Sequence, residues 1–247
     1  MKKEKKHIVN FSGGKDSSAM LLRMIELDMP IDEIVFADTT LELPEMYEWM
    51  NYVEKFIKIR IHKLKPKYNF DEWFYGKFTK GKNKGRQRGF PLVFGKMCHL
   101  RGTFKVNQLT KIQKHNDYIY IGIAKDEEHR TNVKTYKNKK YKFPLIEWGW
   151  SEQDCMNYLK DNNFPFPFFN KKRTGCWLCP QQSLESLKTL MINYPKLWKK
   201  LKQYEKDSPQ GFKPNFKLKE FENKWKYQLK LNFNSVTNSK KDSEKED

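Results

Sequence analysis

The chain has 247 residues, 38% hydrophobic and 15% aromatic, and its 49 Lys and Arg against 30 Asp and Glu give a net charge of +19. The aromatic content is enough for a core and excludes a wholly disordered chain. No run approaches the roughly 20 apolar residues that span a bilayer, and the apolar run after basic residues 1–7 is too short for a secretory leader. We therefore expect a cytoplasmic protein without a membrane partner. Its charge favours a polyanionic partner or, alternatively, reflects only a solvated lysine-rich surface.

Strands and helices alternate along the first half of the sequence. The patterns predict strands over 7–11, 33–37, 57–62 and 118–123, and helices over 18–27, 44–56 and 100–114. This alternation predicts a doubly wound α/β domain with a mainly parallel sheet. Ligands of such domains bind at the carboxyl ends of the strands.

The later segments are predominantly helical. We predict helices over 151–161, 183–193, 195–206 and 217–229, the first of them opened by a capping box at Ser151-Glu-Gln-Asp154. We expect a nucleotide-binding α/β domain over residues 1–170. A Cys-x-x-Cys segment with C-terminal helices packed on that domain follows over 171–233. Residues 234–247 have no apolar partners, which predicts a disordered tail.

A glycine loop, Ser12-Gly-Gly-Lys-Asp-Ser17, lies between the first strand and the first helix. Its glycines let backbone amides approach phosphate oxygens, and the helix N-terminus adds its positive dipole end. Lys15 supplies a cation, and Asp16 is expected to hold Mg²⁺ or to orient the loop, so both are candidate catalytic residues. The alternative is an ordinary glycine turn. The residues expected to contact a nucleotide here are Ser12, Gly13, Gly14, Lys15, Asp16, Ser17 and Ser18.

Further candidate ligands follow two other strands. Asp38 ends the second strand, where its carboxylate would bind a ribose hydroxyl or a metal, or would simply close a turn. Asp126 and Glu127 follow the fourth strand and are candidates for Mg²⁺, and Arg130 is a candidate for phosphate. The alternative for these three is a surface salt-bridge cluster.

Three of the four cysteines indicate a metal centre. Cys176-Trp-Leu-Cys179 presents two thiolates, and Cys98 supplies a third soft ligand from a distant segment. Such a set admits an iron–sulfur cluster or a structural zinc ion with a histidine as fourth ligand. Cys155 shares a helix face with Tyr158 and Leu159, so we expect a small core residue there.

A basic loop precedes Cys98. Residues 77–88 carry six cations and no acid, contain glycines that are expected to make the loop flexible, and are flanked by aromatic residues. Cations interleaved with aromatic side chains suit phosphate contacts and base stacking, whereas the alternative is a solvated, mobile insertion. The residues expected to contact nucleic acid are Lys80, Lys82, Lys84, Arg86 and Arg88.

The glycine loop resembles the PP-loop of the N-type ATP pyrophosphatases, the adenine nucleotide α-hydrolase superfamily. Three later segments are similar to the phosphoadenosine phosphosulfate (PAPS) reductase family within it, in order over residues 8–180. They are Phe36-Ala-Asp-Thr-Thr40 with Leu43-Pro-Glu45, Gly122-Ile-Ala-Lys-Asp-Glu-Glu-His-Arg130, and Pro144-Leu-Ile-Glu-Trp148. Ala124 departs from the arginine usual in that family. The resemblance implies a PP-loop fold and adds Gly122 to the nucleotide-binding residues.

The resemblance also informs the metal centre. In adenylyl-sulfate (APS) reductases of this family, a Cys-Cys pair and a Cys-x-x-Cys hold a 4Fe-4S cluster, whereas the first pair here reads Cys98-His99. The resemblance implies that His99 is the fourth ligand, or that Cys98, Cys176 and Cys179 hold a cluster with one open iron. The second arrangement resembles cluster-dependent tRNA thiolation enzymes.

The family's reductases use a thiol nucleophile near the C-terminus, and this chain has no cysteine after Cys179. We therefore expect ATP-dependent sulfur transfer, forming AMP and pyrophosphate, to a nucleic acid such as tRNA. The alternatives are a DNA phosphorothioation protein, an APS or PAPS reductase served by an external thiol protein, and a zinc-stabilised nucleotide-dependent nucleic-acid-binding module. The sulfur donor and the oligomeric state stay open, a homodimer being one option.

Overall fold

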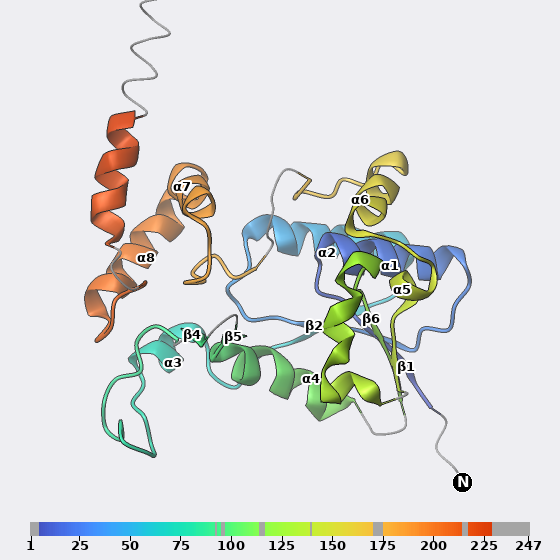
Figure 1. Ribbon diagram of the computed structural model, residues 1–247, viewed down its shortest axis with the longest axis horizontal. Coiled ribbons are helices and arrows are strands. Elements are labelled where there is room, and N and C mark those ends of the chain that lie inside the picture. Colours follow the sequence, from blue (N-terminus) through green and yellow to red (C-terminus); the bar gives the residue numbers. More distant parts are fainter. Residues whose placement is uncertain are drawn as a thin grey trace, which may run out of the picture. The chain divides into compact units, whose positions relative to one another are not determined.

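The computed structural model describes residues 5–91, 93–94, 97–113, 117–138, 140–169, 175–213 and 217–228 (Figure 1). The chain divides into two compact units. The first comprises Met1–Phe70 and His99–Cys176, and the second comprises Asp71–Cys98 and Trp177–Asp247. The tail predicted over 234–247 lies outside the described residues, and the predicted domain limits stay a prediction. Among the residues described, no helix combines the length and apolar character needed to cross a bilayer.

The first unit contains a five-stranded parallel sheet. Its strands are β1 (His7–Asn10), β2 (Glu33–Ala37), β3 (Ile61–Leu64), β6 (Tyr118–Ile121) and β7 (Tyr141–Lys142). Their order in the sheet is β3-β2-β1-β6-β7, so the chain builds outward from β1 to β3 and then returns to the other side of β1. The carboxyl ends of β1 and β6 therefore flank the switch point at which ligands bind in such sheets.

Helices cover both faces of this sheet, which confirms the predicted doubly wound α/β class. They are α1 (Lys15–Glu26), α2 (Pro44–Ile57), α4 (Asn107–Ile112), α5 (Pro144–Glu147) and α6 (Glu152–Asp161). Figure 1 shows α1, α2 and α6 on one side and α4 on the other. Successive strand residues alternate between two cores: Val9, Ile34 and Tyr120 pack with α1, α2 and α6, and Ile8, Val35 and Ile119 pack with α4. Burial on both faces explains the continuous apolar runs of these strands.

The predicted strand over 57–62 was wrong in its first half. Helix α2 continues to Ile57, and Lys58 ends it in the left-handed conformation with φ of 56°. The buried residues of α2 (Met46, Trp49, Met50, Val53 and Ile57) recur at helical spacing. Because this longer pattern places Ile57 in the core as part of a helix, the alternation of Ile57, Ile59 and Ile61 does not produce a strand until Ile61.

The predicted helix over 100–114 is irregular. A π-helix spans Gly102–Val106, and α4 follows as a short regular helix. The predictions missed several short elements, among them α5, β7 and the 3-10 helices Lys125–Asn132 and Lys134–Lys137. Each is too short to leave a periodic pattern in the sequence.

The second unit is mainly helical. Its elements are the end of α3 (Phe70–Tyr75), the antiparallel pair β4 (Val93–Phe94) and β5 (Met97–Cys98), α7 (Leu184–Asn193), α8 (Pro195–Asp207) and a helix over 218–228. Aromatic rings form its core: the centroid of Phe74 lies 5.4 Å from that of Phe90 and 4.8 Å from that of Tyr204. The predicted helices over 183–193 and 195–206 are confirmed within one residue at each end.

Candidate functional site

The glycine loop connects β1 to α1 in a defined turn. Ser17 closes it, because its Oγ accepts a hydrogen bond from the Ser12 amide at 3.1 Å, donates to the Gly14 carbonyl at 3.1 Å and lies 2.9 Å from Ser12 Oγ. Gly13 has φ of +72°, and a Cβ there would lie 2.2 Å from Met46 Sδ, so the turn requires glycine. Gly14 is the N-cap of α1 and has no side chain to cap it. The first amides of α1 are therefore not capped by a side chain at Gly14, and amides in this position can donate hydrogen bonds to an anion.

Lys15 and Asp16 begin α1 and are both partly buried. Lys15 Nζ lies 2.9 Å from Glu152 Oε1 and 3.3 Å from Asp16 Oδ1. Burial lowers the pKa of Lys15, but the hydrogen bond to Glu152 and the charge of Asp16 outweigh it, so the pKa is raised. Burial raises the pKa of Asp16 from its ordinary 3.8 to about 6, against the opposing charge of Lys15. Lys15 is thus held by carboxylates that a bound phosphate would have to displace.

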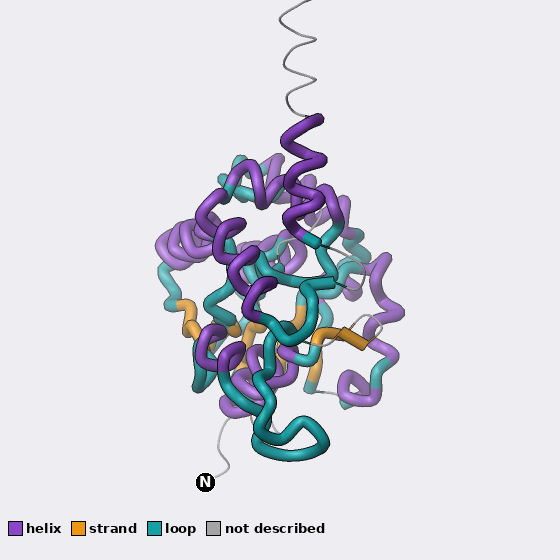
Figure 2. Tube along the Cα trace, turned by 90° about the vertical axis from the view of Figure 1, so that its left-hand side faces the viewer, coloured by secondary structure: helices purple, strands orange, loops and turns teal. Residues whose placement is uncertain are grey.

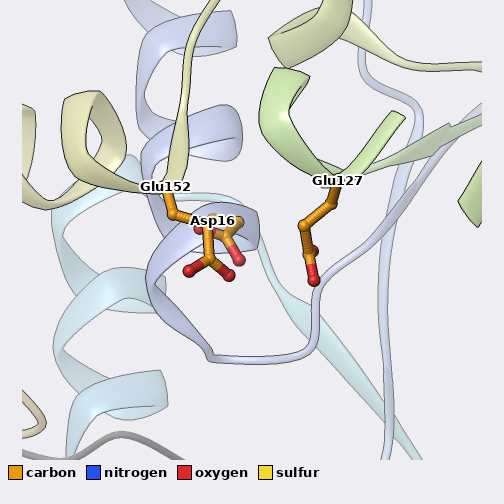
Figure 3. A group of neighbouring side chains, drawn as sticks. All are labelled: Asp16, Glu127 and Glu152. Carbon is orange, nitrogen blue, oxygen red and sulfur yellow. The ribbon is translucent and has the colours of Figure 1, made fainter. Parts of the chain in front are cut away.

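Three carboxylates converge beside the loop (Figure 3). Asp16, Glu127 and Glu152 each offer an oxygen, and these oxygens lie within 4.8 Å of one another. Asp16 Oδ1 is buried, and in the part of the chain that the structure describes it accepts no hydrogen bond but lies 3.3 Å from the Lys15 ammonium. Carboxylate oxygens are the ligands that Mg²⁺ prefers, and a buried carboxylate oxygen without a hydrogen bond can bind a metal cation. The donor set therefore fits a hard divalent cation.

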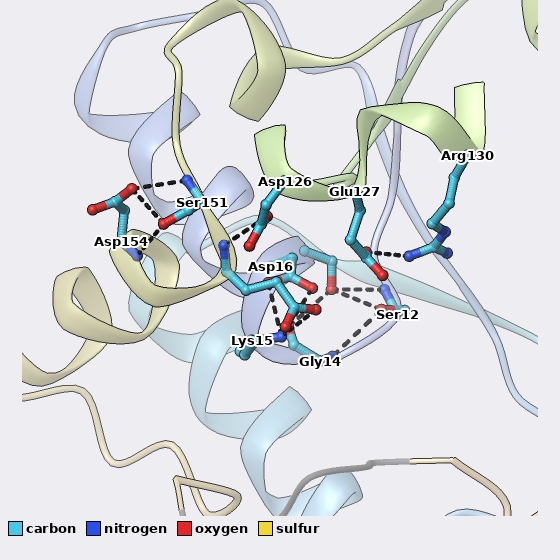
Figure 4. Close-up of polar contacts among 11 residues, drawn as sticks. Ser12, Gly14, Lys15, Asp16, Asp126, Glu127, Arg130, Ser151 and Asp154 are labelled. Carbon is cyan, nitrogen blue, oxygen red and sulfur yellow. Dashed lines mark hydrogen bonds and ion pairs between the residues drawn. The ribbon is translucent and has the colours of Figure 1, made fainter. Parts of the chain in front are cut away.

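This group differs in one member from the predicted magnesium set of Asp16, Asp126 and Glu127. Asp126 is exposed, and its Oδ1 accepts a hydrogen bond from the Glu152 amide at 3.1 Å, which places it at the start of α6 (Figure 4). Glu152 takes its place in the group and was missed by the sequence analysis. The capping box of Ser151 and Asp154, predicted and now confirmed, fixes the end of α6 that carries Glu152.

The segment after β6 passes close to α1. A Cβ on Gly122 would lie 2.8 Å from Ser17 Cα and 2.9 Å from Ser17 N, so glycine allows β6 and the N-terminus of α1 to approach. This gives Gly122 a packing role at the site. Arg130 forms an ion pair with Glu127, as the salt-bridge alternative predicts (Figure 4). Its side chain is half exposed, so a phosphate could replace this partner.

Two other predicted nucleotide ligands have structural partners. Ser18 is fully buried, and its Oγ accepts a hydrogen bond from Trp49 Nε1 at 3.0 Å, which ties α1 to α2. Asp38 is buried, and its Oδ1 accepts hydrogen bonds from the Thr40 amide and the Tyr47 hydroxyl, both at 2.8 Å. Asp38 therefore closes the turn after β2, which is the alternative that the sequence left open.

The cysteines fall in both units. Cys176 belongs to the first, where its Sγ lies 3.6 Å from Thr39 Oγ1, and Cys98 and Cys179 belong to the second. His99 is exposed at the start of a segment of the first unit. The metal centre stays a prediction. Cys155 is completely buried in the core of the first unit, as predicted, and this burial raises the pKa of its thiol.

The basic loop folds back on itself in the second unit (Figure 2), and its expected flexibility stays a prediction. Backbone hydrogen bonds join its two limbs, and Gly81 and Gly85 occupy turns with φ of +75° and +84°. Of the flanking aromatic residues, Trp73, Phe74 and Phe90 are buried in the unit's core and unavailable to bases, whereas Tyr75 is exposed, so base stacking stays a prediction. Arg88 is anchored as well: its Nη1 donates to the Trp73 carbonyl at 3.3 Å, and its guanidinium lies over the Trp73 ring.

The sequence of this chain is similar to those of known proteins. A family model described as the phosphoadenosine phosphosulfate reductase domain matches residues 6–182. A Methanocaldococcus jannaschii protein of uncharacterised function is 30% identical over 206 residues, which cover 78% of this chain and 40% of that protein. The chain thus spans less than half the length of that relative.

Other relatives are named adenosine 5'-phosphosulfate reductase, and two of them are from Geobacillus. The protein from Geobacillus kaustophilus is 28% identical over 65% of this chain and 67% of its own length. The protein from Geobacillus sp. strain WCH70 is 27% identical over 67% of this chain and 69% of its own length. The matched region contains the glycine loop and all three carboxylates of Figure 3.

Proposed function

The chain belongs to the phosphoadenosine phosphosulfate reductase domain family, and from this premise we propose that it is an ATP-dependent enzyme that forms AMP and pyrophosphate. The observation that carries the proposal is the group of three carboxylates at the glycine loop, whose oxygens lie within 4.8 Å of one another. A triphosphate is bound together with a divalent cation, and such a cation needs oxygen ligands beside the phosphates.

In the proposed reaction, a carbonyl oxygen of the acceptor attacks the α-phosphorus of ATP, and pyrophosphate leaves. The amides at the start of α1 would bind the phosphates. The Lys15 ammonium would leave Glu152 and stabilise the negative charge that develops on the phosphates. Asp16, Glu127 and Glu152 would hold a divalent cation, whose charge neutralises the polyphosphate. A sulfur nucleophile would then attack the adenylated carbon, and AMP would leave.

The sulfur source belongs to the same proposal and rests on the sequence. Cys98, Cys176 and Cys179 would hold an iron–sulfur centre, and none of them forms a disulfide within the part of the chain that the structure describes. Anaerobic protein should then be brown and contain iron and sulfide. Single Cys→Ser changes at the three positions should bleach it, and Cys155→Ala, at the buried core cysteine, should not. Stoichiometric zinc without iron would contradict the cluster.

The names of the Geobacillus relatives support a second function, reduction of a sulfonucleotide by an external thiol. The two functions differ in their products. A reductase breaks a bond to sulfur and releases no pyrophosphate.

The experiment that separates them compares ATP with APS and PAPS on anaerobic protein. Pyrophosphate release from ATP should require Mg²⁺ and should be lost in Asp16→Asn. Asp28→Asn is the matched control, because it removes a carboxylate from a left-handed residue just after α1, where Asn is tolerated. Thiol-dependent release of sulfite from APS or PAPS without Mg²⁺, and no turnover of ATP, would contradict the proposal.

A further inference from the structure

We infer that Asp126 is a positioning residue of the proposed cation site: it holds the backbone of Glu152 and does not coordinate the cation itself. The inference deepens the proposed function, on which it rests for the presence of a divalent cation. Both residues belong to the first unit.

The three carboxylates of the cation site come from three separate elements. Asp16 lies in α1, and Glu127 lies in the 3-10 helix Lys125–Asn132 that follows β6 (Figure 3). Glu152 is the first residue of α6, and the chain passes through β7 and α5 before it reaches this residue. A cation site needs ligands in a defined geometry, so the contacts that hold these elements together are part of the site.

Two hydrogen bonds join the 3-10 helix to the start of α6. The Lys125 amide donates to the Trp150 carbonyl at 2.7 Å. The Glu152 amide donates to Asp126 Oδ1 at 3.1 Å, as Figure 4 shows. Because Asp126 precedes Glu127 in the chain and accepts from the amide of Glu152, it links the backbones of two of the three carboxylates.

The bond to Asp126 adds a second hold on the N-terminus of α6. The first amides of a helix have no partner within the helix. The Asp154 amide donates to Ser151 Oγ at 3.2 Å, and Asp154 Oδ2 accepts from the Ser151 amide at 2.8 Å, which completes the capping box. This box does not use the Glu152 amide, which donates to Asp126 instead. The first turn of α6 is therefore held from within and from the 3-10 helix.

Asp126 does not itself belong to the group of converging oxygens. Asp16, Glu127 and Glu152 each offer an oxygen within 4.8 Å of the other two, and Asp126 belongs to no such group of described residues. Hydrogen bonds that orient metal ligands typically change metal affinity by about 10- to 100-fold. Since Asp126 is exposed and water can partly replace its oxygen, we expect an effect at the lower end of that range.

The test measures binding of Mn²⁺ alone to the full chain, because the electron paramagnetic resonance signal of free Mn²⁺ weakens as the ion binds. Mn²⁺ shares the preference of Mg²⁺ for carboxylate oxygens. Asp126→Ala removes the acceptor and should weaken Mn²⁺ binding about 10-fold. Asp126→Asn keeps an oxygen that can accept from the Glu152 amide. Salt screens the charge it loses, so its affinity should stay within about threefold of the parent's.

The matched control is Glu128→Ala, two residues along the same 3-10 helix. The Glu128 carboxylate is exposed and pairs with Lys125 Nζ at 2.6 Å. The control removes the same charge as Asp126→Ala and should also bind Mn²⁺ within about threefold of the parent. Asp16→Asn should abolish binding, which shows that the Mn²⁺ signal reports this site. Circular dichroism should show that every variant is folded.

Hydrogen exchange followed by NMR in EDTA tests the bond without any cation. The Glu152 amide should exchange faster in Asp126→Ala than in the parent, and at nearly the parent rate in Asp126→Asn. Equal exchange rates in the parent and Asp126→Ala would overturn the inference.

The Mn²⁺ titrations can overturn it in two further ways. Parent-like binding by Asp126→Ala would remove the positioning role. Equal losses in Asp126→Ala and Asp126→Asn would assign the effect to the carboxylate charge and not to the bond. In both cases the parent still binds Mn²⁺, so the proposed function survives. A parent that binds no Mn²⁺, or Mn²⁺ binding that Asp16→Asn does not change, would overturn the cation site and with it both proposals.

Discussion

Replacing Asp16 with Asn should stabilise the ligand-free protein, and the gain should depend on pH. Burial raises the pKa of Asp16 to about 6 from its ordinary 3.8. Between these values the folded protein binds more protons than the unfolded chain, so stability falls as pH rises from about 4 to about 6 and stays low above that range. A difference of about two pH units corresponds to about 3 kcal/mol at neutral pH. Asparagine has a similar shape and carries no charge, so it should recover up to that amount.

The assay is urea unfolding of the parent and Asp16→Asn in EDTA at pH 7.5, 6 and 5. The free energy of unfolding of the variant should exceed that of the parent most at pH 7.5, and the difference should shrink toward pH 5. Asp28→Asn should not reproduce this gain. Adding Mg²⁺ with ATP should stabilise the parent and leave the variant nearly unchanged, since ligand binding to the folded state adds to stability. An advantage of the same size at pH 5 and 7.5 would refute the reasoning.

Three further changes test other parts of the structure. Lys15→Ala should slow pyrophosphate release without unfolding the protein, because it removes about 2–4 kcal/mol of transition-state stabilisation. Turnover equal to that of the parent would exclude the loop as the active site. Gly122→Ala should weaken ATP binding and lower the melting temperature, because its Cβ would meet the backbone of α1, whereas Gly102→Ala, with open space around it, should do neither. Burial opposes the low pKa of Glu222, but hydrogen bonds from Lys202 and Lys226 lower it to about 2. Glu222→Gln should therefore cost about 1–3 kcal/mol at pH 7, and urea unfolding should show this cost vanish as pH falls from about 4.5 toward 2.

The central strands were predictable because they are buried on both faces. Ile8, Val35 and Ile119 face one core, and their chain neighbours face the other, so each strand appears as an unbroken apolar run. The segment at Ile57 was not predictable from local alternation. Its position is decided by packing of α2 on the core, and this packing is visible in the sequence only when the pattern is followed back to Met46.

Some residues of the site were likewise predictable from the sequence, and others were not. The loop from Ser12 to Ser17 was predictable, because a strand, a glycine turn and a helix N-terminus are contiguous in the sequence. Glu152 was not, since it lies far along the chain and reaches Lys15 only through the fold. The fold also decided between alternatives that the sequence left open, giving Asp38 the role of closing a turn.

The charges around Lys15 explain why nucleotide and cation should bind together. In the ligand-free chain, Lys15 partly neutralises Asp16 and Glu152. A triphosphate that draws Lys15 away would leave the carboxylates of Asp16, Glu127 and Glu152 facing one another and facing the phosphates, all of them negative. A divalent cation reduces both the repulsion among the carboxylates and their repulsion from the phosphates, because oxygens of both groups coordinate it. A sulfonucleotide bound without a cation would gain no such compensation. These charges therefore support the proposed function, in which a polyphosphate binds together with a divalent cation.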